Sequence, residues 1–140
     1  MNYILDTNVV SELVAVQPEL HVIDWLEELD PRQVFLSVIA IGEIKRGIDK
    51  LSDSKRKELL DQWLREDLLV RFEGHLLPID TDTMLLWGAI NARLEAIGRP
   101  IAAIDALLAA TAMQYQYTLV TRNTGHFGNV KIQLLNPWER

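Results

Sequence analysis

The sequence predicts an α/β fold in which helices cover both faces of a parallel sheet. Short apolar runs alternate with longer segments whose apolar residues recur at helical spacing, and this alternation is typical of parallel sheets. The length of 140 residues suits one compact core, so we expect a single domain over residues 1–140. With 49% apolar and 24% charged residues, the composition is that of a globular protein and excludes the disordered and fibrous classes.

The absence of cysteine and the negative net charge exclude several classes of functional site. The chain has no cysteine, which excludes disulfides, thiolate catalysis and cysteine-based zinc or iron–sulfur sites. The net charge of −6 argues against passive nucleic-acid binding, although it is compatible with an acidic metal site that meets phosphate through the ion. The longest uncharged stretch, residues 106–121, is too polar for a membrane span. Because the amino terminus also lacks signal-peptide features, we expect a soluble, cytoplasmic protein with no membrane partner.

The first third of the chain predicts two strands and three helices. Residues 2–5 form an apolar run that ends at Asp6 and predict the first strand. Asn8 or Ser11 is expected to cap a short helix that runs to residue 15, and Pro18 precedes a helix over residues 19–29. Residues 34–36 predict the second strand, after which Ser37 caps the third helix. The apolar stripe of that helix consists of Ile41, Ile44, Ile48 and Leu51.

The rest of the chain continues the alternation. Residues 54–72 predict a long helix and residues 76–79 the third strand, after which Asp80 or Thr81 caps a helix that ends near Gly98. Pro100 is expected to open the next helix, which runs to about residue 114. Residues 117–120 and 130–134 predict the fourth and fifth strands. Ligands of open parallel sheets bind beyond the carboxyl ends of strands, near the point where strand order reverses, so Asp6 and the loop from Thr121 are the candidate positions.

Three acidic side chains stand out by their surroundings. Asp6 ends an apolar strand, Glu43 lies on its helix between the small residues Ala40 and Gly47, and Asp105 interrupts an apolar helical segment. Asp6 has the ordinary alternative of a helix cap, and Asp105 that of a first-turn acid favoured by the helix dipole. Taken together they favour one shared cleft, because each lies at the end of an element or on a face of small residues.

Convergent carboxylates repel one another unless they are protonated or bind a cation. Hard oxygen ligands without His or Cys favour Mg²⁺ or Mn²⁺ over zinc. Such clusters commonly serve phosphodiester chemistry, in which one or two ions activate water and stabilise the leaving oxygen. The pattern therefore indicates a metal-dependent hydrolase of phosphodiesters.

Four sequence blocks carry a resemblance to a known family. They are ILDTNVVSE (residues 4–12), SVIAIGEIKRG (37–47), AIDALLAATA (103–112) and TRNT (121–124). In order and spacing these blocks resemble the PIN-domain ribonucleases of the VapC toxin group, including its FitB-like branch. The resemblance covers nearly the whole chain, from Asn2 to the Asn-Pro-Trp ending.

The resemblance implies a PIN-like fold, a five-stranded parallel sheet flanked by helices on both faces. It also implies that Asp6, Glu43 and Asp105 are catalytic carboxylates that hold Mg²⁺ or Mn²⁺. The family often places a fourth acid after the fourth strand, where this chain has Asn123. Asn123 is therefore expected to act through an uncharged amide oxygen, which favours a one-metal mechanism.

Four neighbouring residues are candidates to support that site. Thr7, Asn8 and Thr121 would orient water or carboxylates, with turn and capping chemistry as the alternative, and Arg122 would contact an RNA backbone. A further basic set is a candidate for the same contact, with a solvated helix face as its equal alternative; it comprises Lys45, Arg46, Lys50, Lys55, Arg56 and Lys57.

The remaining distinctive side chains favour structural roles. The three histidines show no metal-binding spacing, and only His126 lies near the proposed site. We expect surface or packing roles for His21, His75 and His126. The tryptophans of the expected helices, Trp25, Trp63 and Trp87, predict core or interface packing.

By resemblance, the protein is the toxin of a VapBC-type toxin–antitoxin system and an endoribonuclease, with transfer RNA among its candidate substrates. The resemblance implies a VapB-type antitoxin that occupies the site and binds operator DNA through its other end, and it implies a homodimer. The alternative is a catalytically weak PIN module that serves mainly in a repressor complex, because Asn123 replaces an acid. An Asp-nucleophile phosphatase would need a second Asp where this chain has Asn8, and a receiver domain would need paired acids beside Asp6, so both are disfavoured.

Overall fold

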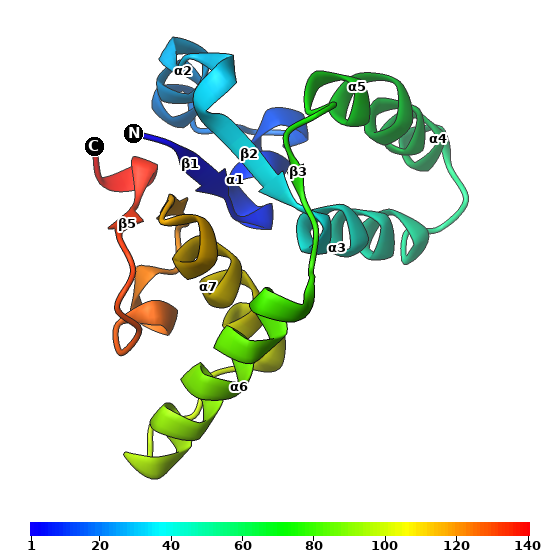
Figure 1. The fold of residues 1–140 in the computed structure, drawn as a ribbon. Helices are drawn as coiled ribbons and strands as arrows, with labels where there is room; N and C mark the ends of the chain where they lie inside the picture. The colour runs from blue at the N-terminus through cyan, green and yellow to red at the C-terminus, as the bar shows by residue number, and fades with distance from the viewer.

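The computed structural model describes all 140 residues and contains one five-stranded sheet with helices around it (Figure 1). The strands are β1 (Tyr3–Leu5), β2 (Val34–Ser37), β3 (Leu76–Leu77), β4 (Thr118–Val120) and β5 (Leu134–Leu135). The α-helices are α1 (Thr7–Ser11), α2 (Leu20–Glu28), α3 (Val38–Asp49), α4 (Lys55–Trp63), α5 (Leu69–Arg71), α6 (Thr81–Ala96) and α7 (Ala103–Tyr115). None of these helices combines the length and the apolar character that a bilayer span requires.

The order of the strands creates a switch point at the centre of the sheet. The order is β3-β2-β1-β4-β5, and every neighbouring pair is parallel. From β1 the chain moves outward through β2 to β3, then returns to β4 on the other side of β1. The carboxyl ends of β1 and β4 therefore lie side by side, and the Asp6 amide donates to the Val120 carbonyl over 2.9 Å. This is where the rule for open parallel sheets places a ligand.

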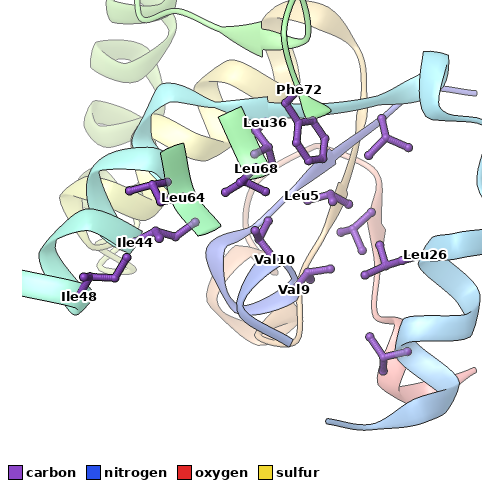
Figure 2. Packing of buried hydrophobic residues seen from close by; sticks show 13 residues of the cluster. Leu5, Val9, Val10, Leu26, Leu36, Ile44, Ile48, Leu64, Leu68 and Phe72 are labelled. Carbon is purple, nitrogen blue, oxygen red and sulfur yellow. The ribbon is translucent and has the colours of Figure 1, made fainter. Parts of the chain in front are cut away.

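Each face of the sheet carries its own hydrophobic cluster, as the predicted fold class requires. Side chains of successive strand residues point to opposite faces. Leu5 and Val120 accordingly pack on one face with residues of α1, α2 and α3, while Ile4 and Leu119 pack on the other with residues of α6 and α7. Figure 2 shows the first cluster, in which Leu64, Leu68 and Phe72 close over the strands.

Several predicted helix ends are confirmed in atomic detail. Ser37 caps α3 by accepting a hydrogen bond from the Ile39 amide over 3.1 Å. Asp80 caps α6 and forms a capping box with Thr83. At the other end of α6, Gly98 adopts a φ of 69° and the Arg99 amide donates to the Leu94 carbonyl over 2.8 Å. This left-handed turn is the conformation for which glycine is favoured.

Other predicted boundaries are wrong. Asp6, not Asn8 or Ser11, caps the first helix, because its carboxylate already accepts from the Thr7 amide. Pro100 does not open α7, which begins at Ala103 after an extended connection. The fifth strand begins only at Leu134, because the backbone of residues 130–133 is irregular, with bends at Val130 and Ile132.

The predicted long helix over residues 54–72 is continuous but not uniform. A π-helical segment, Leu64–Leu68, separates α4 from α5. The apolar stripe of α3 also ends early, since Ile44 and Ile48 are buried while Leu51 is 39% exposed.

Candidate functional site

A cleft of about 330 Å³ opens at the carboxyl ends of β1 and β4. The three predicted carboxylates line it from separate elements: Asp6 follows β1, Glu43 comes from α3 and Asp105 from the first turn of α7. The other lining residues are Thr7, Asn8, Ile104, Leu108, Asn123 and His126. The structure therefore brings together in one place the acids that the sequence placed far apart.

Asp6 is the most deeply placed of the three acids. It is 9% exposed, and its Oδ1 accepts from the Thr7 amide over 2.7 Å while its Oδ2 accepts from the Thr121 hydroxyl over 2.8 Å. Burial raises the pKa of Asp6 above its ordinary value of 3.8, and these two hydrogen bonds oppose that shift. The charges of Glu43 and Asp105 raise the pKa of Asp6 further, because like charges nearby disfavour its ionised form.

Thr121 is the centre of a small polar network beneath the cleft. It is fully buried. Its Oγ1 accepts a hydrogen bond from the backbone amide of Asn123 over 3.1 Å and donates one to Asp6. The Asn8 side-chain amide contacts both Asp6 Oδ2 and Thr121 Oγ1, over 3.3 and 3.4 Å. The network links the end of β1 to the loop after β4 and fixes the orientation of the Asp6 carboxylate.

The other two carboxylates each have one partner at the rim. The Thr7 hydroxyl donates to Glu43 Oε1 over 2.7 Å. Asp105 has a side chain that is 27% exposed, and its Oδ2 lies 3.3 Å from Nδ1 of His126. Of the residues that the sequence proposed as orienting groups, Thr7 thus serves Glu43, and Asn8 and Thr121 serve Asp6.

The donor set fits a hard divalent cation, although the side chains are not closed around one. Asp6, Glu43 and Asp105 offer carboxylate oxygens to a common cleft, which is the chemistry that Mg²⁺ and Mn²⁺ prefer. No three His, Cys, Asp or Glu side chains are close enough as they stand to hold one ion. Mutual repulsion keeps carboxylates apart, and a cation relieves it. Ligation by all three would therefore require the rim side chains to move inward.

Arg122 lies outside the cleft and is held by the carboxyl-terminal segment. Its guanidinium carbon lies 5.0 Å from the centre of the Trp138 ring, a cation–π distance. Its carbonyl accepts from the Asn136 side chain over 3.3 Å, and its amide donates to Asn8 Oδ1 over 3.2 Å. Arg122 is exposed, so its charge faces solvent beside the site.

Three of the six residues in the further basic set form hydrogen bonds or ion pairs within the protein. Lys45 Nζ contacts Asp49 Oδ1 and Asp61 Oδ1 over 2.9 and 3.0 Å, in a charged groove of about 710 Å³ between α3 and α4. Lys57 donates to the Leu51 carbonyl and Arg56 to the Val14 carbonyl. For these three residues the contacts favour the helix-face alternative over a contact with RNA. The other three residues, Arg46, Lys50 and Lys55, are exposed.

His126 is expected near the site but without a role there, and the structure makes it a lining residue. The absence of metal-binding spacing favoured a surface or packing role, which takes no account of the topology that brings its turn against α7. Its position three residues after Asn123, in the loop already selected by the strand order, was the available signal. His21 and His75 lie elsewhere and contact the backbone carbonyls of Trp138 and Val34. Trp25, Trp63 and Trp87 pack against the two hydrophobic clusters, as expected.

Comparison with known proteins gives consistent matches across the chain. A family model described as PIN domain matches residues 3–132. Toxin FitB from Neisseria gonorrhoeae is 37% identical over 135 residues, covering 96% of this chain and 97% of FitB. VapC ribonuclease Y4jK from Sinorhizobium fredii is 30% identical over 136 residues, covering 97% of both chains. The crystal structure of VapBC2 from Rickettsia felis, bound to a DNA fragment from the VapBC2 promoter, includes a chain 28% identical to this one, with a TM-score of 0.80 and coverage of 97% and 98%.

Proposed function

Because the chain belongs to the PIN-domain family, we propose that it is a metal-dependent endoribonuclease and the toxin of a VapBC-type toxin–antitoxin pair. One observation carries the proposal: three carboxylates from separate elements share a cleft at the switch point of a parallel sheet. Two similar proteins support it by name, one as a toxin and one as a VapC ribonuclease.

We assign the metal ligands to Asp6, Glu43 and Asp105, with Mg²⁺ or Mn²⁺ as the ion. When bound, such an ion supplies Lewis-acid chemistry for phosphodiester hydrolysis. The chain supplies orientation: Thr121 and Asn8 hold the Asp6 carboxylate, and Thr7 holds that of Glu43. Asn123 lies in the same cleft and contributes an uncharged amide.

RNA would approach from the exposed side of the cleft. Arg122 lies beside it with its guanidinium held against Trp138, so its charge is available to a phosphate while its side chain is already ordered. With a net charge of −6, the chain needs such local positive charge to meet an anionic substrate. Transfer RNA is one candidate substrate.

The proposed partners follow from the similar structure. VapBC2 from Rickettsia felis is bound to DNA from its own promoter, and we infer that this chain joins a VapB-type antitoxin and meets operator DNA through it. A homodimer and a cytoplasmic location complete the proposal. A second candidate function, a binding module with weak turnover, is favoured by a single observation, the amide of Asn123 in place of an acid.

RNA cleavage by the purified chain tests the proposal. Cleavage is expected in Mg²⁺ or Mn²⁺, with loss on addition of a chelator and loss in Asp6→Asn and Asp105→Asn. The matched control is Asp24→Asn, which removes an exposed carboxylate on α2 and should leave cleavage unchanged. Cleavage that survives Asp105→Asn would refute the assigned site. Ion binding without any cleavage, and without growth arrest on expression alone, would favour the binding module.

A further inference from the structure

His126 is the only imidazole that lines the acidic cleft. It lies in a short 3₁₀ helix, η4 (Thr124–Phe127), which follows the loop after β4. The polar groups that line the cleft therefore include three carboxylates, the side-chain amides of Asn8 and Asn123, and one imidazole. The expected surface role agrees with its exposure, and the structure adds that its imidazole faces Asp105 in the cleft.

Neighbouring residues hold the backbone of His126 in position. Phe127 is fully buried in the cluster formed with α6 and α7, and it anchors the turn. The backbone amide of His126 also donates to the backbone carbonyl of Asn123 over 3.0 Å, which fixes the backbone between these two residues. The imidazole itself is 60% exposed and so remains accessible from solvent.

The separation between His126 and Asp105, an ordinary contact distance for a histidine and a carboxylate, also suits two ligands on one ion. Nδ1 of His126 lies 3.3 Å from Oδ2 of Asp105. Two ligand atoms at right angles, each bonded at about 2.1 Å, lie about 3 Å apart. No third acid or histidine completes this pair as the side chains stand. Movement of Asp6 or Glu43 toward the pair would complete the group.

We propose that His126 is a nitrogen ligand beside Asp105, and that it supplies, as a neutral donor, the further ligand that an acid at the position of Asn123 would have provided. The inference rests on the metal site of the proposed function. Imidazole binds transition ions well and Mg²⁺ poorly, whereas carboxylates suit both. The cleft should therefore prefer Mn²⁺ to Mg²⁺ more strongly than a set of oxygen ligands alone.

Pulsed electron paramagnetic resonance of Mn²⁺ added to the purified wild-type chain tests the bond directly. A bound imidazole gives a nitrogen hyperfine coupling, which carboxylate and amide oxygen ligands do not give. The coupling is expected in the wild type, absent in His126→Ala, and retained in the control His21→Ala, which removes an exposed histidine on α2. Bound Mn²⁺ without nitrogen coupling would overturn the inference.

Calorimetric titration gives a second, independent measurement. His126→Ala should weaken Mn²⁺ binding by about tenfold or more while changing Mg²⁺ binding by less than about threefold. Adding Asn123→Asp to His126→Ala should restore the affinity for Mn²⁺ without restoring the nitrogen coupling. Mn²⁺ binding unaffected by His126→Ala but lost in Asp105→Asn would overturn this inference and leave the proposed metal site intact, whereas no binding to the wild type would overturn both.

Discussion

A single buried hydroxyl, that of Thr121, decides how the deepest carboxylate of the cleft is presented. It donates a hydrogen bond to Asp6 Oδ2 and accepts one from the backbone amide of Asn123, so it connects two lining residues across the switch point. Sequence reasoning could name Thr121 only as a candidate, because turn chemistry uses the same residue type. Its full burial and its donation to an acid make it a positioning residue.

Thr121→Val keeps the shape of the side chain and removes the hydroxyl. Loss of this hydrogen bond should raise the pKa of Asp6 further, because the bond now opposes the effect of burial. We expect Mn²⁺ affinity to fall by about 10- to 100-fold, the usual effect of removing a group that orients a ligand. Calorimetry measures it, and Thr121→Ser, which restores the hydroxyl, is expected to recover most of the affinity. Equal losses in both variants would contradict this role.

At the scale of elements, the cap of α6 provides a stability test that is separate from the cleft. The Asp80 carboxylate accepts from the Thr83 amide over 3.0 Å and from the Gln114 side chain of α7 over 3.0 Å. These bonds lower the pKa of Asp80 below 3.8, with the Thr83 amide as the largest cause. The ionised carboxylate therefore stabilises the fold above pH 3.8, and this contribution disappears as the pH falls through the lower folded-state pKa.

Asp80→Asn should consequently lower the thermal unfolding midpoint at neutral pH and have a smaller effect at a pH below the folded-state pKa. Thermal melts of both chains across this range measure the difference. The exposed residue Asp82, two positions along the same helix, supplies the control Asp82→Asn. A pH-independent difference between wild type and Asp80→Asn would show that the charge of Asp80 does not contribute.

The π-helical segment between α4 and α5 contributes core contacts to one face of the sheet. Leu68 is 1% exposed there and packs in the cluster of Figure 2, whereas Leu59 on α4 is 53% exposed. Leu68→Ala should lower the free energy of unfolding by about 2–5 kcal/mol, because it leaves a cavity. Leu59→Ala should change it by no more than about 0.5 kcal/mol. Denaturant titration measures both, and a loss at Leu68 no larger than that at Leu59 would contradict the packing role.

At the scale of the whole molecule, the sequence predicts the arrangement of the site better than its details. The alternation of apolar runs and helices yields the parallel sheet, and the resemblance of four blocks selects Asp6, Glu43 and Asp105, which do share a cleft. Their common cleft is predictable because it depends only on which strand and helix ends adjoin. The role of these residues as metal ligands stays a prediction.

The parts that could not be predicted depend on contacts between distant segments. His126 reaches the cleft through the burial of Phe127 against α6 and α7, and no local pattern encodes that packing. The late start of α7 after Pro100 and the late start of β5 depend on how connections fit between elements whose ends are already fixed. The engagement of Lys45 and Lys57 likewise depends on the approach of α4 to α3.

Asp6 serves two purposes, as the cap of α1 and as a member of the acid cluster, and the two respond differently to one substitution. Asn caps helices about as well as Asp. The raised pKa of Asp6 means that its ionised form opposes folding as the pH rises through that pKa, so Asp6→Asn removes a cost at neutral pH. The new side-chain amide takes the place of Oδ2 beside the Thr121 hydroxyl and the Asn8 amide, which offsets part of this gain. We expect a thermal midpoint close to that of the wild type, with RNA cleavage abolished; a clearly lower midpoint would contradict this.

The double role of Asp6 also has a genetic consequence. An Asp codon becomes an Asn codon by one base change, and here that change would remove the activity of the proposed toxin without producing a misfolded chain. Cells that survive expression of the protein should therefore repeatedly carry this allele as a full-length, well-folded product. Such an allele could persist in a population as a silent copy, because protein quality control would have no reason to remove it.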